Sequence, residues 1–223
     1  MHRASQTGRA TEDALTTTPT ARPGARAAKR RAITQGARTV FGREGYSRTS
    51  IEAIAAEAGV STRTIYNHFQ GKDQLFSEVL HDSASQVADA FIATVDEQLT
   101  GTDARADLLA LGHALVGQRT RFPDHFAMIR QIRAEAHHFP PAVIDTWQQA
   151  GPHRVHQEVT RRLTALTRTD APAHATAHFI ALVDSEISPP QTPAQIDACV
   201  TRAVDAFLHG YRGTEGSAES GAS

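Results

Sequence analysis

Hydrophobic residues recur with a helical period along almost the whole chain. The segment expected to form the first helix, 25–43, places Ile33, Ala37, Val40 and Phe41 on a single apolar stripe. Alternation of hydrophobic and polar residues, which would predict β-strands, is scarce, and the sequence contains no Asn-Gly hairpin signal. The pattern therefore predicts an all-α fold.

Two short helices with clear start signals follow this segment. The residues TSIE at 49–52 form a capping-box pattern, which predicts Thr49 as the N-cap of a helix that ends at Gly59. Ser61 is expected to cap the next helix, over 62–68.

The rest of the chain is predicted to be a larger helical body. Before it, Lys72 and Asp73 are expected to open a fourth helix of the first unit, and the helices expected in the body cover 82–99, 104–120, 124–138, 141–168, 171–187 and 194–211. Pro152 lies inside one of these segments and is expected to kink or split it. The stretches 1–24 and 213–223 contain almost no large apolar residue and are expected to be disordered tails. The folded part then divides into a first unit over 25–80 and a body over 81–212.

Composition narrows the class of protein. Of the 223 residues, 40% are hydrophobic and 21% charged, which predicts a folded globular chain. The single cysteine, Cys199, excludes a disulfide framework and a cysteine-built zinc site. No apolar run is long enough for a transmembrane helix, and the N-terminus lacks the apolar core of a secretory signal. We therefore expect no membrane association and a cytoplasmic location.

The charges are distributed unevenly along the chain. Residues 1–80 hold 12 Lys and Arg against 7 Asp and Glu, whereas residues 81–223 hold 11 against 17. A basic first third on an acidic body favours a polyanionic partner for the first third only.

The stretch 51–69, IEAIAAEAGVSTRTIYNHF, has the spacing of a helix-turn-helix. Gly59 lies where the backbone must reverse, and Ile65 and Phe69, four residues apart, are expected to face inward. The residues left on the opposite, solvated face are Thr62, Arg63, Asn67 and His68. In a helix-turn-helix, this face enters the major groove of DNA.

This stretch and its surroundings, over roughly residues 29–80, resemble the DNA-binding domain of the TetR/AcrR family of transcriptional regulators. The resemblance rests on Gly45-Tyr46, Thr49, Ile54-Ala55, Ala58-Gly59-Val60-Ser61, Tyr66, His68-Phe69, Lys72 and Leu75, all in register. It implies an N-terminal three-helix helix-turn-helix DNA-binding domain followed by a larger helical ligand-binding and dimerisation domain.

Residue types and resemblance together suggest roles toward DNA. Thr49 and Ser61 head their helices and are expected to offer a hydroxyl and a backbone N–H to phosphate. Arg63 is the main candidate for specificity, because arginine pairs bidentately with guanine. The resemblance implies phosphate contacts for Tyr66, His68 and Lys72 and base-edge contacts for Thr62, Arg63 and Thr64, and the exposed Asn67 completes the expected set.

Four basic residues are expected in an N-terminal arm that follows phosphates or reaches the minor groove: Arg26, Lys29, Arg30 and Arg31. Structural alternatives stay open for several candidates. Arg30 and Arg31 would then form only a solvated face, Tyr66 would be a core residue, and His68 would cap a helix without touching DNA.

From Arg121 onward, the sequence RFPDHFAMIRQIRAEAHHFPPAVIDTWQQAGPHRV resembles the C-terminal domain of an AefR-like branch of this family. This implies an effector pocket among the middle helices and a homodimer built from the last two long helices. The expected lining residues are His125, Phe126, Met128, Trp147 and Phe179, with packing in a core as the alternative for each. Their apolar character favours a hydrophobic or aromatic small molecule. Two DNA-binding units ~34 Å apart would match a palindromic operator.

The 12 histidines raise a metal-binding alternative. Glu78 and His81, and likewise Glu135 and His138, have the Glu-x-x-His spacing of di-iron helical bundles, but chance accounts for two such pairs. No Gly-rich phosphate loop or nucleophile elbow is present. We therefore expect a ligand-responsive regulator, most simply a repressor, without enzymatic activity, metal or cofactor. The alternatives are a helical-bundle metal-binding enzyme and an effector-free DNA-binding protein.

Overall fold

The structure is a computed structural model that describes residues 23–135, 139, 141–167, 171–185 and 192–211. All regular secondary structure in these ranges is helical, which confirms the all-α prediction. The helices are α1 (Pro23–Glu44), α2 (Ile51–Ala58), α3 (Thr62–Tyr66), α4 (Lys72–Gln98), α5 (Ala104–Arg121), α6 (Pro123–Ala134), α7 (Pro141–Ala150), α8 (Pro152–Thr167), α9 (Pro172–Ser185) and α10 (Pro193–Tyr211). The predicted tails lie outside the described residues, except that Pro23 and Gly24 already belong to α1.

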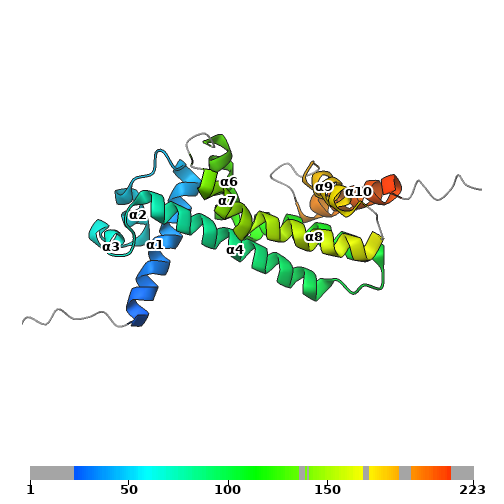
Figure 1. The fold of residues 1–223 in the computed structure, drawn as a ribbon, viewed down its shortest axis with the longest axis horizontal. Coiled ribbons are helices and arrows are strands. Elements are labelled where there is room, and N and C mark those ends of the chain that lie inside the picture. Colours follow the sequence, from blue (N-terminus) through cyan, green and yellow to red (C-terminus); the bar gives the residue numbers. More distant parts are fainter. Residues whose placement is uncertain (1–22, 136–138, 140, 168–170, 186–191, 212–223) are drawn as a thin grey trace, which may run out of the picture.

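The helices form an elongated molecule (Figure 1). Helices α1, α2 and α3, called the head below, lie at one end, and α9 and α10 lie at the other. Helices α4 and α8 run along the length between them. In the part of the chain that the structure describes, no helix is long and apolar enough to cross a membrane.

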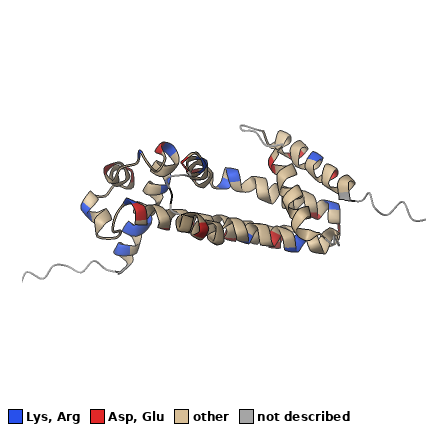
Figure 2. Ribbon diagram, turned by 45° about the horizontal axis from the view of Figure 1, so that its top comes forward, with Lys and Arg blue, Asp and Glu red and all other residues tan. Residues whose placement is uncertain are grey.

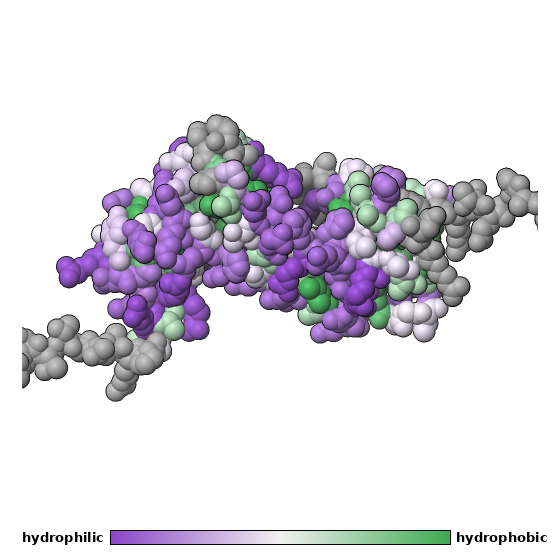
Figure 3. Space-filling model, viewed as in Figure 1, coloured by the Kyte–Doolittle hydropathy of each residue, from purple (hydrophilic) through white to green (hydrophobic). Residues whose placement is uncertain are grey.

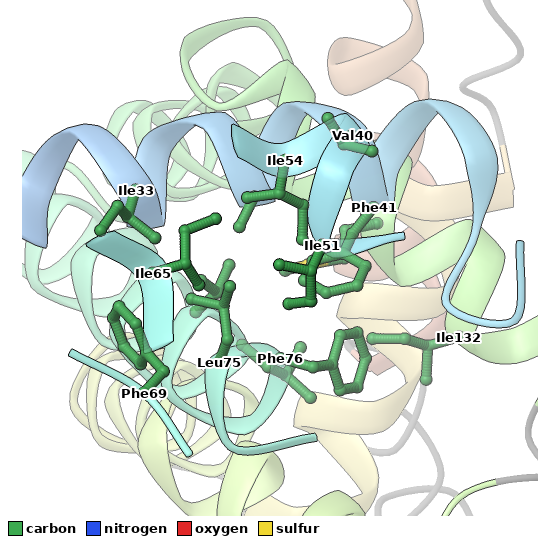
Figure 4. Packing of buried hydrophobic residues seen from close by; sticks show 14 of the residues in the cluster. Ile33, Val40, Phe41, Ile51, Ile54, Ile65, Phe69, Leu75, Phe76 and Ile132 are labelled. Carbon is green, nitrogen blue, oxygen red and sulfur yellow. The ribbon is translucent and has the colours of Figure 1, made fainter. Parts of the chain in front are cut away.

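The first core of the protein packs the head against the beginning of α4. Ile33 and Phe41 of α1, Ile54 of α2 and Ile65 of α3 are fully buried there. Figure 4 shows these side chains pointing toward one another, with Leu75 of α4 among them. The apolar stripe predicted for the first helix is thus the face that α1 buries.

Helix α6 enters this core from the side of the body. Two glycines, Gly42 in α1 and Gly45 directly after it, allow its approach: a Cβ at Gly42 would lie 3.3 Å from the Cβ of Ala127, and one at Gly45 would collide with the carboxylate of Glu135. Gly45 also has φ +82, a left-handed conformation that glycine adopts without strain. The α6 residues buried in the shared core are Met128, Ile129 and Ile132.

The structure corrects the predicted N-cap of α2. Ser50 is the N-cap, and its Oγ accepts a hydrogen bond from the Ala53 N–H at 3.1 Å. Thr49 is buried, and its hydroxyl donates to the Gly45 carbonyl oxygen at 2.6 Å. The prediction was wrong by one residue because adjacent Thr and Ser both suit an N-cap. Gly59 ends the helix with φ +64, as expected.

Helix α3 starts as predicted and ends two residues early. Ser61 is its N-cap, with Oγ accepting from the Thr64 N–H at 3.2 Å. After Tyr66 the chain turns, and the N–H groups of His68 and Phe69 both donate to the Ile65 carbonyl oxygen at 2.9 Å. This turn carries the Phe69 ring into the core.

Helix α4 is a single helix of 27 residues, whereas the sequence predicted a break near residue 81. Its buried stripe continues across that point through Leu80, Ser83, Ala84 and Val87. At 1.5 Å per residue the helix is about 40 Å long. It therefore crosses the boundary predicted between 25–80 and 81–212 and belongs to both halves.

The second core lies in the body, among α4, α5, α8, α9 and α10. Phe91, Phe179 and Phe207 are fully buried there, and the rings of the last two meet edge to face with centroids 5.2 Å apart. Helix α10 packs closely on α5 at Gly112, where a Cβ would lie 2.7 Å from the Val200 side chain.

Pro152 splits its segment as predicted. Helix α7 ends at Ala150 and α8 begins at Pro152. Gly151 between them packs directly on α4, where a Cβ would lie 2.8 Å from the Ala84 carbonyl oxygen. The break thus places α7 and α8 against the long central helix.

Candidate nucleic-acid interface

The face of α3 opposite the core carries exposed polar and aromatic side chains. Ile65 is fully buried and Phe69 is 2% exposed, so this side of the helix faces inward as the spacing predicts. Arg63 and Asn67 are exposed, and Tyr66 is 56% exposed. The core alternative for Tyr66 is therefore wrong. Thr62 and Thr64 are half-buried at the edge of the same face.

The N-terminal end of α3 is exposed and internally ordered. Ser61 is exposed, and its Oγ lies 2.9 Å from the Thr64 hydroxyl as well as accepting the Thr64 N–H. These bonds fix the first turn of α3, which begins with Thr62 and Arg63.

Thr49 does not lie on this surface. It is 3% exposed, its hydroxyl donates to Gly45, and its N–H donates to the Tyr46 carbonyl oxygen at 3.3 Å. The expectation that Thr49 offers a hydroxyl and an N–H to phosphate is therefore corrected. Ser50, which the sequence analysis did not single out, is the exposed residue at the start of α2. Its position directly after a threonine was the only signal for it.

Lys72, the first residue of α4, holds part of the head by hydrogen bonds. Its Nζ donates to the carbonyl oxygens of Tyr46 and Thr49, at 3.0 and 3.1 Å, and lies 4.5 Å from the centroid of the Tyr46 ring. Two of its three N–H groups are thus engaged by the loop at 45–49, which joins α1 to α2.

The basic residues expected in an arm lie instead on the first turns of α1. Arg30 pairs with Glu78 of α4, donates to the His68 carbonyl oxygen at 3.4 Å and lies 4.6 Å from the centroid of the Phe69 ring. Arg30 is therefore a structural residue. Three other basic side chains on these turns are exposed: Arg26, Lys29 and Arg31.

His68 lies two residues after the end of α3 and is influenced by the charges of this basic group. Partial burial lowers its pKa, and so do the positive charges of Arg26, Arg30 and Lys29. Three cations of α1 thus lie near enough to His68 to affect its pKa, and Figure 2 shows Lys and Arg at this end of the molecule. Arg30 is already paired with Glu78, so the exposed charges of Arg26 and Lys29 are the ones that would attract an anion there.

The five residues expected to line one effector pocket are not brought together. Met128 is buried in the first core and Trp147 packs against it, whereas Phe179 is buried in the second core against Phe207. Phe126 is half-buried, with its ring against that of His125. Met128 lies on α6 and Phe179 on α9, and these helices pack in different cores, which the residue types alone do not indicate. The core alternative holds for Met128 and Phe179.

His125 is the most chemically distinctive of these residues. It is 6% exposed, and its Nδ1 lies 2.6 Å from the hydroxyl of Ser83 on α4. Burial, with a smaller effect of Arg38, lowers the pKa of His125 to about 4. The imidazole is therefore neutral near pH 7.

Three buried polar atoms have no hydrogen-bond partner among the described residues: Arg38 Nε on α1, Gln118 Oε1 on α5 and Trp147 Nε1 on α7. A buried donor or acceptor without a partner costs about 1–3 kcal/mol. Gln118 and Ser83 were not found by sequence analysis, because nothing in their spacing distinguishes them from other helical residues.

No group of three or more His, Cys, Asp or Glu suited to a metal ion occurs among the described residues. Glu78 of the first Glu-x-x-His pair is engaged by Arg30. His138 of the second pair lies outside the described residues.

Comparison with known proteins matches two family models to separate parts of the chain. Residues 33–79 match the model described as bacterial regulatory proteins, tetR family. Residues 106–213 match the model described as the C-terminal domain of AefR-like transcriptional repressors. The first match covers most of the head and the start of α4, and the second covers the body from α5 onward.

Curated relatives match mainly through a short segment. The HTH-type transcriptional repressor Rv1474c of Mycobacterium tuberculosis is 34% identical over 62 residues, 28% of this chain and 33% of that protein. The HTH-type transcriptional repressor KstR2 of Mycolicibacterium smegmatis is 37% identical over 60 residues, 27% of this chain and 29% of that protein. The chain thus spans about a third of the length of these relatives.

Solved structures match over most of the chain. A TetR-family transcriptional regulator from Mesorhizobium loti has a TM-score of 0.72 and 27% sequence identity, over 83% of this chain and 97% of that one. The whole arrangement of head and body is therefore similar to that regulator.

Proposed function

The chain belongs to the TetR family of bacterial regulatory proteins, and on this premise we propose that it is a homodimeric, ligand-responsive repressor of transcription. Regulators of this family are not enzymes. The proposal assigns DNA binding to residues 25–80 and effector binding and dimerisation to 81–212, with α4 shared between them. Such a regulator acts where the DNA is, in the cytoplasm.

The observation that carries the proposal is the two-sided character of α3. Ile65 and Phe69 anchor it in the core, and Arg63, Tyr66 and Asn67 are presented to solvent on the other side. We assign base reading to Arg63, supported by Thr62 and Thr64 at the edge of the face. Phosphate contacts are assigned to Ser61, Tyr66, His68 and the remaining N–H of Lys72.

Dimerisation is assigned to α9 and α10. They lie at the end of the molecule away from the head (Figure 1), and hydrophobic residues reach the surface over this end more often than over the head (Figure 3). A shallow hollow on this pair is lined by His178, Leu182, Ala206, Phe207 and Gly210. Two copies joined here would present two heads to the two halves of a palindromic operator.

The effector site is assigned to the region where α4, α6 and α7 meet. Buried His125 and Ser83 lie at the contact of α4 with α6, and Trp147 of α7 packs on the first core with its indole N–H unpaired. A small hydrophobic or aromatic molecule with one polar group would satisfy this combination. Its binding would shift the population toward a conformer in which the heads no longer match the operator.

The direct test is binding of the purified full-length protein to DNA upstream of its own gene, at 50 and 200 mM salt with random DNA as competitor. We expect a specific complex that weakens strongly with salt, because several phosphates are neutralised. Equal binding to the upstream and the random DNA would count against operator recognition at that locus and against the assigned base-reading face.

A further inference from the structure

The head and the body also touch at the C-terminal end of α6, and the proposed function does not use this contact. Glu135, the C-cap residue of α6, accepts hydrogen bonds through its carboxylate from both the backbone N–H, at 3.0 Å, and the hydroxyl of Ser47. Ser47 belongs to the loop 45–49 between α1 and α2. A residue of the body therefore holds a loop of the head.

This loop determines where α2 begins. The Thr49 hydroxyl bonds the Gly45 carbonyl oxygen across the loop, and Lys72 bonds the carbonyl oxygens of Tyr46 and Thr49 from α4. The next residue, Ser50, is the N-cap of α2. With its ends tied in this way, the loop transmits a displacement at Ser47 to α2 rather than absorbing it.

Helix α6 is attached to α1 at its other end as well. Asp124 in its first turn accepts hydrogen bonds from Gln35 Nε2 and Thr39 Oγ1 of α1, both at 3.5 Å. Between the two ends, the glycine at 42 lets the helices approach to van der Waals contact with Ala127. One carboxylate at each end of α6 thus fastens it along the head.

We propose that Glu135 is a positioning residue for DNA binding: its carboxylate fixes α2 and α3 relative to α6, and movement of the end of α6 releases them. The inference rests on the proposed function, because it names the contact that would connect the effector site to the DNA-binding helices. Helix α6 also carries His125, bonded to Ser83 of α4. A ligand that separates α6 from α4 at that bond would therefore act on the head through Glu135.

The sign of the effect distinguishes this role from simple electrostatics. A carboxylate near DNA repels phosphate, so removing its charge alone would strengthen binding. Removing a positioning contact has the opposite effect, because the orientation of α2 and α3 is then no longer fixed before DNA arrives.

The test uses the full-length protein and a duplex that the wild-type protein selects from a random-sequence pool. The variants are Glu135→Ala, the conservative Glu135→Gln and Ser47→Ala. Asp145→Ala, which removes a carboxylate from an exposed position on α7, is the matched control. Affinity at two salt concentrations and hydrogen exchange of the Ser47 amide and the first turn of α2 are measured, after circular dichroism confirms helical content.

We expect Glu135→Ala to weaken binding about tenfold, as loss of hydrogen bonds to a charged group predicts, with an unchanged salt slope. Exchange at the Ser47 amide should speed up, Glu135→Gln should lie between Glu135→Ala and wild type, and Asp145→Ala should leave all measurements unchanged. The double variant of Glu135→Ala with Ser47→Ala should be no weaker than Glu135→Ala alone.

Binding by Glu135→Ala as tight as by Asp145→Ala, or unchanged exchange at Ser47, would overturn the positioning role. Failure of the wild-type protein to select any sequence is a different result. It would overturn the proposed function first, and the positioning role would fall with it.

Discussion

Arg63 is the residue on which recognition of base sequence depends in this account. It is exposed on α3, and Ser61 and the buried Ile65 hold the helix around it. The spacing of the helix-turn-helix was sufficient to place Arg63, Tyr66 and Asn67 on the solvated side, because that side follows from the helical period alone.

Arg63→Ala should relax base preference at one position of each half-site and cost about 1–3 kcal/mol of binding to the selected duplex. A bidentate contact to guanine is lost, whereas phosphate contacts stay. Affinities for duplexes substituted one position at a time measure this effect, with Arg130→Ala, at an exposed position of α6, as control. An equal loss on every duplex would assign Arg63 to the phosphates instead.

At several positions, the sequence alone could not show which hydrogen-bond partner a polar side chain has in the folded protein. Thr49 and Ser50 are chemically alike, and only the fold shows that the hydroxyl of Thr49 bonds Gly45 while Ser50 caps α2. The family resemblance implied a phosphate contact for Lys72, and Arg30 was a candidate for phosphate or the minor groove, yet both bond partners within the protein. Local residue spacing does not reveal a hydrogen-bond partner that lies far away along the chain.

His125 gives the stability a defined pH dependence. Its pKa falls from 6.5 to about 4 on folding, so the unfolded chain binds more protons below pH 6.5. Stability is full above pH 6.5 and is lost as the pH falls toward 4, by about 1.4 kcal/mol per pH unit from this group. Urea unfolding of wild type and His125→Gln at pH 7, 6 and 5 should show a shallower decline in the variant. Parallel declines would mean that His125 is not buried as a neutral ring.

At the scale of elements, helix types and most boundaries followed from periodicity and from glycine and proline. Gly59 and Pro152 end or split their helices as expected. The break predicted near residue 81 was wrong, because the buried stripe of α4 runs through that point without a stop signal. The sequence did not predict which helices pack together. Helix α6 packs on α1, for example, although their residues lie far apart along the chain.

Close packing of α1 on α2 depends on Gly36. A Cβ at this position would lie 2.9 Å from the backbone nitrogen of Ala58. We expect Gly36→Ala to lower the free energy of unfolding by about 1–3 kcal/mol, because the backbone must move to make room. Gly117→Ala, at an exposed site of α5 where a Cβ meets nothing within 4 Å, should instead raise it by roughly 0.5–1 kcal/mol through helix propensity. Urea denaturation of both variants decides; a Gly36→Ala protein as stable as wild type would refute the tight contact.

At the scale of the whole molecule, two cores share one long helix. From α4, the first core includes Leu75, Phe76, Val79 and Leu80, and the second includes Phe91 and Val95. Motif and charge predicted a boundary at residue 80, and the structure has one helix running through that point, which the sequence did not predict. Because α4 and α6 both pack against the head, the proposed effector response would reach it through packed helices.

The proposed dimer gives a prediction at this scale. Ala206 is exposed on α10 and lines the hollow on the α9–α10 surface. Ala206→Arg should convert the dimer to a monomer in sedimentation velocity, because an arginine on each copy would be buried against its symmetry mate without a partner. Ala93→Arg, at an exposed site of α4, should remain dimeric. A dimeric Ala206→Arg protein would move the interface elsewhere.

The most direct test of the account is the sequence that the full-length protein enriches from a random pool of duplex DNA. The account predicts an inverted repeat with half-site centres about one helical turn apart, bound by one dimer or a multiple of it, and with an affinity that falls steeply with salt. Enrichment of no sequence, or of a site without two-fold symmetry, would contradict a dimer that reads DNA through the exposed face of α3.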